Sequence, residues 1–196
     1  MTPAPYTLSF TVGGLFLFEG IELARLRATC PSWEEVRRSA PDGVFVAKGG
    51  VSSVKRIRNE VIGRLTKLTP AEIDYLASAG MTDARALMWV AACRKYRILA
   101  EFAYEVLDER LRTYQLEIRV TDFDALVDAK GVNAAEITRI SPSTRARLRS
   151  GAFRMLREAE ILDAESRVRT LPLSETLRNL LGRDPRSGLN LIPGGG

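Results

Sequence analysis

The sequence predicts a mainly helical (all-α) protein, built as a helical bundle. Three observations lead to this fold class. Apolar residues recur at spacings of three and four in several stretches, which is the period of a helix with one buried face. Helix-capping signatures precede several of these stretches. The composition, with 45% hydrophobic and 27% charged residues, is that of an ordinary globular protein.

The N-terminal part of the chain is predicted to hold three helices. The first covers residues 15–28, and its inward-facing residues are expected to be Phe18, Ile21, Leu23 and Leu26. Ser32 is a good N-cap for a short helix that runs to about Arg38. Residues 51–68 form the clearest amphipathic helix, although Arg58 falls inside its apolar stripe.

The middle of the chain begins with a capping box. Thr69 is the N-cap, Pro70 takes the first helical position and Glu72 the third, so a helix is expected to start here. Residues 83–114 contain neither proline nor glycine. They predict either one long helix or two helices joined by a kink near Tyr96.

The last long helix is predicted to open at Ser141-Pro142 and to run to residue 160. One of its faces is apolar. The opposite face carries Ser143, Arg147, Ser150 and Arg154, at spacings of four, three and four. Residues 116–120 and 167–173 could supply short strands, so the fold class leaves room for a small β-wing near the C-terminus.

Three parts of the chain are expected from these elements. Residues 1–80 would form an N-terminal helical domain, and residues 81–182 a C-terminal helical domain that contains the second basic helix. Residues 183–196 are rich in glycine and proline and are expected to form a flexible tail.

Positive charge is concentrated in two segments. Residues 48–67 hold six basic residues against one acid, and residues 139–157 hold six arginines and no acid. The intervening residues 69–128 hold eleven acids and seven bases. Because solvated helix faces usually mix both signs, this pattern favours a surface that binds a polyanion. Charged faces without any binding role are also common, and that interpretation stays open.

The candidate nucleic-acid-binding residues lie on the polar faces of these two basic helices. Arginine and lysine would contact phosphates, and small serine side chains would donate hydrogen bonds while letting the backbone approach closely. The candidates are Lys48, Ser52, Lys55, Arg56, Lys67, Ser143, Arg145, Arg147, Ser150 and Arg154. Phosphate contacts carry no base information, so low sequence specificity is expected.

The composition argues against several classes of enzyme. The chain has no histidine, which removes Ser-His-Asp and Cys-His nucleophiles and histidine-ligated metals. Its glycine pairs lack the spacing of a phosphate-binding loop. Cys30 and Cys93 lie too far apart for a zinc or redox motif and are expected to be reduced. We therefore expect no catalytic residue, no metal and no cofactor.

A group of carboxylates at helical spacing could suggest a metal or acid-base site, but ion pairing is the favoured interpretation. The carboxylates are Glu101, Glu105, Asp108 and Glu109, and their expected partners are Arg97, Arg110 and Arg112. Residues 84–103 are interrupted by charges and are not expected to enter a membrane. The expected location is therefore the cytoplasm.

Taken in order, short motifs along the chain resemble the BrxA family of BREX phage-defence systems. They are Tyr-Thr-Leu-Ser at 6–9, Gly-Gly-Leu at 13–15, Lys-Arg-Ile at 55–57, Arg-Leu at 64–65, Leu-Thr-Pro at 68–70, Lys-Tyr-Arg at 95–97, Phe102, Glu-Val at 105–106, Asp-Phe-Asp at 122–124, Ser-Thr-Arg at 143–145 and Met-Leu-Arg-Glu-Ala at 155–159. The resemblance covers residues 6–162, and it depends on the order and spacing of the motifs.

The resemblance implies a small, mainly helical protein with helix-turn-helix-like parts, which would make residues 1–80 a helix-turn-helix-like domain. It also implies that the protein binds double-stranded DNA and works with other BREX-system proteins. Such a system methylates host DNA and blocks phage replication, and the resemblance names no catalytic residue. Members were long labelled inner-membrane proteins, a label that this sequence does not support. Two alternatives stay open. One is a protein-docking scaffold subunit of the same system, and the other is an RNA-binding factor like the helical antitermination proteins.

Overall fold

The computed structural model describes residues 5–10, 13–48, 51–182 and 188–195, without the side chains of residues 46–48, 51 and 52. This part of the chain is mainly helical, as the sequence predicts. The α-helices are α1 (Leu17–Thr29), α2 (Trp33–Ser39), α3 (Val51–Leu65), α4 (Pro70–Leu76), α5 (Met81–Lys95), α6 (Arg97–Phe102), α7 (Asp108–Arg112), α8 (Val120–Gly131), α9 (Ala135–Thr138), α10 (Pro142–Glu158) and α11 (Glu175–Gly182). Shorter turns are the 3-10 segments η1 (Asp42–Lys48) and η3 (Gly188–Leu191) and the π-helical segment η2 (Ala103–Leu107).

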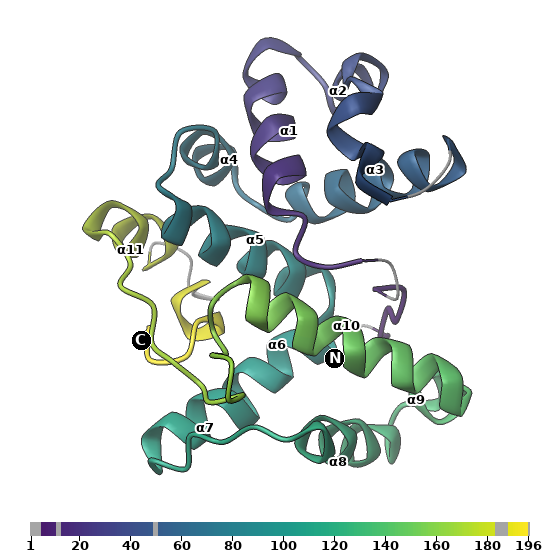
Figure 1. Ribbon diagram of the computed structural model, residues 1–196, viewed down its shortest axis with the longest axis vertical. Helices are drawn as coiled ribbons and strands as arrows, with labels where there is room; N and C mark the ends of the chain where they lie inside the picture. The colour runs from purple at the N-terminus through teal and green to yellow at the C-terminus, as the bar shows by residue number, and fades with distance from the viewer. Residues whose placement is uncertain (1–4, 11–12, 49–50, 183–187, 196) are drawn as a thin grey trace.

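The helices are arranged around α5. Helices α1, α2 and α3 lie together at the top of Figure 1, α7, α8 and α9 lie at the bottom, and α10 crosses the middle. Helices α1, α3, α4 and α10 all contact α5. Every side chain from 86 to 93 is buried, so this central stretch of α5 is apolar on all sides, as expected for a helix enclosed by others.

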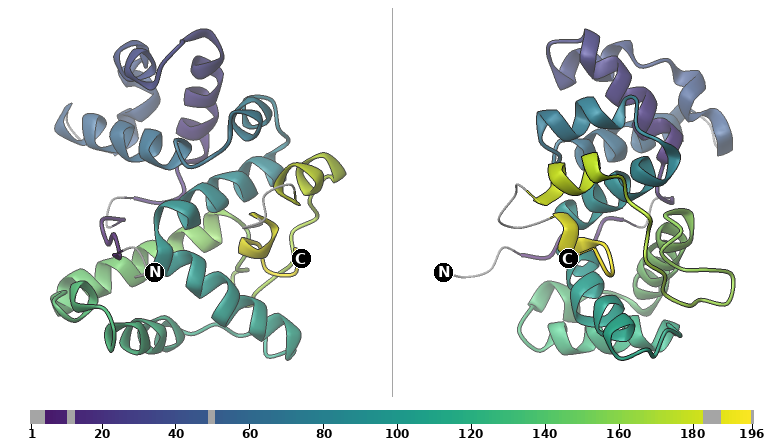
Figure 2. Two further views of the ribbon diagram at one scale, coloured as in Figure 1. Left: turned by 180° about the vertical axis from the view of Figure 1, so that it is seen from behind. Right: turned by 90° about the vertical axis from the view of Figure 1, so that its left-hand side faces the viewer.

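The end of the described chain returns to this central helix. Figure 2 shows the C-terminal segment, in yellow, at mid-height of the molecule in both views. Leu191 and Ile192 are buried, and the indole Nε1 of Trp89 donates a hydrogen bond of 2.7 Å to the carbonyl oxygen of Leu191. Residues 188–195 are therefore packed against the core.

Several predicted helix starts are confirmed by their hydrogen bonds. The Ser32 hydroxyl accepts from the amide of Glu35 at the start of α2. Thr69 and Glu72 form the complete capping box of α4, and the Ser141 hydroxyl accepts from the amide of Thr144 in α10. These caps satisfy amide groups that have no partner inside a helix. Because the cap and its partner are only three residues apart, the start of each helix could be predicted from a short stretch of sequence.

The long helical region 83–114 is interrupted, as one of the two predicted alternatives required. Tyr96 leaves the helical conformation with φ −119° and ψ 94°, so α5 ends there and α6 begins at the next residue. The chain continues through the π-helical turn η2 into α7. The kink predicted near Tyr96 is confirmed.

The sequence left room for short strands at residues 116–120 and 167–173, but no strand is present in the described residues. Two isolated antiparallel bridges are formed instead, Glu117 with Arg167 and Leu162 with Val168. The segment after residue 166 changes partner at each step. The Val168 amide donates to the carbonyl oxygen of Leu116, whereas the Arg169 amide donates to that of Ile161. A β-wing needs one continuous partner, so these residues form none.

The orientation of Phe18 differs from the sequence prediction, and the contacts of Arg58 explain its place in the apolar stripe of α3. Phe18 was expected to face inward but is 68% exposed, because it lies on the same face of α1 as the exposed residues Glu22 and Arg25, four and seven positions later. Arg58 lies in the apolar stripe of α3 because its guanidinium covers the ring of Phe45, pairs with Asp42 and donates to the Arg37 carbonyl oxygen. The aliphatic part of Arg58 is therefore buried, while its guanidinium charge is neutralised by Asp42.

Candidate nucleic-acid interface

The polar face of α10 is the most continuous part of the candidate interface. Ser143, Arg147, Ser150 and Arg154 are all exposed, and the side chains of Leu148, Ala152, Met155 and Leu156 on the other side of the helix are buried. Pro142 and the Ser141 cap start the helix, which then runs for 17 residues without interruption. The amphipathic pattern of this helix is therefore confirmed, with arginines and small hydroxyls on its exposed side.

Helix α3 contributes fewer exposed charges than its sequence suggests. Lys55 and Arg56 are exposed near its start, and Lys67 is exposed in the turn that follows its end. The remaining candidates of this segment, Lys48 and Ser52, have side chains that lie outside the described residues. Arg56 and Lys67 are therefore separated by most of the length of α3.

One depression brings the two basic helices together. It has a volume of about 680 Å³ and lies between the start of α1, the start of α3 and the end of α10. Two sequence candidates, Arg56 and Arg154, line it. Two further arginines line it as well, Arg85 of α5 and Arg157 of α10. We call this depression the arginine cleft.

The arginine cleft also contains acids. Arg154 pairs with Glu158 at 2.7 Å, and Arg85 pairs with Glu160 at 3.2 Å. Both arginines keep appreciable exposure, and ion pairs of this kind contribute little stability, so an arriving phosphate can replace the carboxylate. Arg56 has no ion-pair partner among the described side chains.

The glycine pair 13–14 lines the arginine cleft at the point where the N-terminal segment meets the end of α10. A Cβ on Gly13 would lie 2.1 Å from the ring of Phe16, and a Cβ on Gly14 would lie 2.1 Å from a carboxylate oxygen of Glu158. Glu158 accepts a hydrogen bond from the amide of Leu15. The end of α10 therefore contacts the N-terminal segment directly, because these two residues have no side chains.

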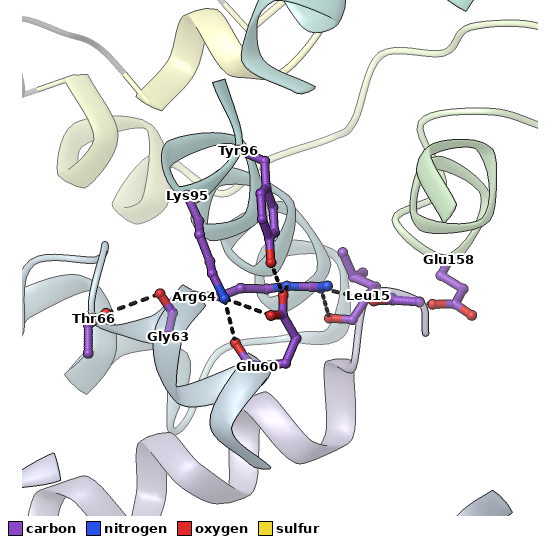
Figure 3. Close-up of polar contacts among 9 residues, drawn as sticks. Leu15, Glu60, Gly63, Arg64, Thr66, Lys95, Tyr96 and Glu158 are labelled. Atoms are coloured by element: carbon purple, nitrogen blue, oxygen red, sulfur yellow. Dashed lines mark hydrogen bonds and ion pairs between the residues drawn. The ribbon is translucent and has the colours of Figure 1, made fainter. Parts of the chain in front are cut away.

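A buried polar network lies next to this glycine pair (Figure 3). The Glu60 carboxylate accepts from the Arg64 side chain at 2.8 Å, from Lys95 at 2.7 Å and from the Tyr96 hydroxyl at 2.6 Å. Arg64 is fully buried and donates to the carbonyl oxygens of Gly14 and Leu15. Burial, together with the hydrogen bond to Glu60, raises the pKa of Tyr96. The network joins α3, α5 and the start of α1.

Arg145 is placed differently from the other candidates on α10. Its guanidinium pairs with Asp124 at 3.1 Å and with Asp128 at 2.5 Å, and Arg149 also pairs with Asp124. The hydrogen bond with Asp128 raises the pKa of Arg145 and lowers that of Asp128. The structure therefore engages Arg145 in fixing α10 to α8, and it does not join the exposed face formed by Arg147 and Arg154.

The acidic middle of the chain is largely engaged in ion pairs, as expected, but two of the pairs have other partners than the sequence suggested. Arg97 pairs with Glu101, and Arg112 with Asp108, whereas Glu105 pairs with Lys130 and Arg110 with Asp122. The described residues contain no group of three metal-ligating side chains. Cys30 and Cys93 are both free thiols, and Cys93 is buried.

The sequence reasoning missed three residues of the arginine cleft. Arg157 belongs to the same helix face as Arg154, three residues later, and helical spacing could have found it. Arg85 and Phe18 were not among the candidates, because they lie outside the two basic segments 48–67 and 139–157. Only the packing of α1, α5 and α10 brings them to the cleft.

The fold and this surface define a small helical protein with two basic helix faces that meet at one cleft. No helix in the described part of the chain is long and apolar enough to cross a membrane. The chain belongs to the BrxA family, because the family model, described as BrxA, matches residues 4–184. Members of this family are components of BREX phage-defence systems.

A solved structure shares the fold. It is described as the crystal structure of an uncharacterized protein from Magnetospirillum magneticum, with a TM-score of 0.74 and 16% sequence identity. The match covers 91% of this chain and 92% of that chain. No curated protein matches the sequence.

Proposed function

We propose that this protein is a non-catalytic component of a BREX phage-defence system that binds double-stranded DNA with little sequence preference. The observation that carries the proposal is the exposed face of α10. Its arginines and serines lie on one side of an uninterrupted helix, and the same face leads into the arginine cleft beside Arg56. A phosphate backbone can follow such a row, because guanidinium groups supply charge and hydroxyls supply short-range hydrogen bonds.

The structure also favours phosphate contacts over base contacts. The serines of this face are too short to reach base edges from a position above the backbone, and long arginine side chains are flexible enough to follow phosphates on any sequence. The protein would work in the cytoplasm beside other BREX-system proteins, which are its further proposed partners.

The test is a titration of fluorescent duplex DNA, single-stranded DNA and structured RNA at about 50 and 200 mM salt, because each phosphate contact adds to the salt dependence. We expect tight duplex binding that weakens steeply with salt. Replacing Arg147→Ala and Arg154→Ala together should lower duplex affinity about tenfold and flatten the salt slope by about two units.

A matched control uses Arg112→Ala with Arg119→Ala. These arginines are exposed and ion-paired like Arg154, but they lie on α7 and just before α8. The control removes the same net charge and should leave both the affinity and the slope nearly unchanged. Equal losses in the two double variants would mean that total charge, not the α10 face, governs binding. A clear preference for RNA would replace DNA as the ligand, and binding to none of the three would favour a docking subunit.

A further inference from the structure

The first turn of α1 presents an aromatic side chain to the arginine cleft. Phe18 lines the cleft and is 68% exposed, although apolar rings of this size are normally buried in a folded protein. It lies on the face of α1 that also carries the exposed Glu22 and Arg25. The turn that precedes this helix is strained. Phe16, the residue that precedes α1, has φ 59° and ψ 47°, a left-handed conformation that a bulky residue rarely adopts. Such strain tends to be retained where a function depends on it.

The strained turn is held in place by its surroundings. The Phe16 ring packs over the Cα of Gly13 and faces the buried Arg64 guanidinium at 5.2 Å. Arg64 in turn is fixed by Glu60 and by the Gly14 carbonyl oxygen. Phe18 is therefore an exposed ring on a rigid support, which is what a stacking platform requires.

Four arginines line the same cleft as this ring and come from three helices. They are Arg56 on α3, Arg85 on α5, and Arg154 and Arg157 on α10. An exposed aromatic ring among arginines is the chemistry that binds an unstacked base with its flanking phosphates. The volume of about 680 Å³ falls within the range of small-molecule sites, which is about 300–1,000 Å³. It accommodates one nucleotide but not a duplex.

We propose that the arginine cleft receives a single unpaired nucleotide from the DNA that lies along α10. Its base stacks on Phe18, and its flanking phosphates contact Arg56, Arg154 and Arg157. This inference rests on the proposed function, because the paired DNA on either side is held by the α10 face. It predicts that a regular duplex fills only part of the site, and that DNA with a bulged or extruded nucleotide fills all of it.

The test compares a regular duplex with the same duplex carrying one unpaired nucleotide at its centre, by fluorescence anisotropy on the full chain. We expect the bulged duplex to bind about tenfold more tightly, a size consistent with one base–aromatic stack. Phe18→Ala should abolish this preference and leave the affinity for the regular duplex unchanged. Phe18→Tyr, which keeps the ring, should retain the preference. Thermal unfolding of each variant checks that the fold is intact.

Tyr114→Ala is the matched control, because Tyr114 is 89% exposed and lies beside other arginines in a different depression. It should leave the preference for the bulged duplex unchanged. Equal affinity of the unaltered protein for both duplexes, or a preference that survives in Phe18→Ala, would overturn this inference while regular duplex binding still supports the proposed function. Absence of regular duplex binding would overturn the proposed function instead.

Competition with deoxynucleoside monophosphates distinguishes a nucleotide within a strand from a free one. A nucleotide within DNA is held additionally by the α10 face, so free monophosphates should displace the bulged duplex only at millimolar concentration. Micromolar binding of a monophosphate that disappears in Phe18→Ala would overturn the assignment to DNA and make the free nucleotide the occupant.

Discussion

The two basic segments look alike in sequence but use their arginines differently. In the first segment, residues 48–67, Arg64 is fully buried and Arg58 covers the ring of Phe45. These two arginines therefore interact with groups inside the fold and are not available to bind phosphate. In the second segment, residues 139–157, most of the arginines on α10 stay exposed. Arg145 and Arg149 are tied to acids of α8, whereas the exposed Arg154 pairs only with Glu158 of its own helix. Net charge along a segment therefore overstates the phosphate-binding capacity of the first helix and describes the second one better.

The largest effect expected from this comparison is on stability, in the first segment. Arg64→Ala would leave Glu60 buried with one cationic partner fewer and would remove the donor to the carbonyl oxygens of Gly14 and Leu15. Breaking a buried ion pair in this way costs about 3 kcal/mol of unfolding free energy. Chemical denaturation of the variant measures this loss. A variant as stable as the unaltered protein would show that the network is dispensable.

A smaller effect is expected at Arg145, which sharpens the comparison within the second segment. Arg145→Ala removes the pairs with Asp124 and Asp128. It should lower the unfolding free energy by about 1 kcal/mol, mainly through the partly buried pair with Asp124, because Asp128 is exposed and its pair contributes little. The salt slope of duplex binding should stay unchanged, in contrast to the loss expected for Arg147→Ala. A flattened slope would mean that Arg145 leaves its carboxylates to contact phosphate.

The smallest effects concern pH, and they should appear at opposite ends of the scale. The pKa of Tyr96 is raised in the folded protein, so the unfolded chain loses this proton first and stability falls as pH rises above about 10. The pKa of Asp128 is lowered by Arg145, so its contribution is present above about pH 4 and is lost as pH falls further.

Denaturation midpoints measured across pH test both directions. Tyr96→Phe should flatten the alkaline side of the stability profile and leave the acid side unchanged. Asp128→Asn should do the reverse. Identical profiles for the two variants would show that other groups control the pH response.

The helix boundaries could be predicted because their determinants are local. The Thr69 capping box and the Ser141 cap act within three residues, and each is formed as the sequence indicates. The break at Tyr96 was one of two alternatives, since nothing nearby in sequence forces it. It follows from burial of the Tyr96 ring, whose hydroxyl reaches Glu60 from another helix.

The candidate site was only partly predictable, because its limits depend on contacts between distant segments. Arg145 faces α8 because Asp124 and Asp128 lie one helical turn apart on that helix, and periodicity within α10 does not reveal them. Phe18 was assigned to the core because its side chain is apolar, although helical spacing places it on the same face as the exposed Glu22 and Arg25. Helical periodicity finds a face, whereas tertiary packing decides which of its members are free.

The hydrogen bond from Trp89 to Leu191 has a consequence for how the molecule is assembled. Its two residues are 102 positions apart, yet the bond satisfies the indole of the most enclosed helix. A ribosome must therefore release residue 191 before the interior around α5 is closed, and contacts over such separations slow folding. Until then the nascent chain exposes an apolar helix. Chaperones bind chains in such a state, and aggregation of the exposed helix competes with folding.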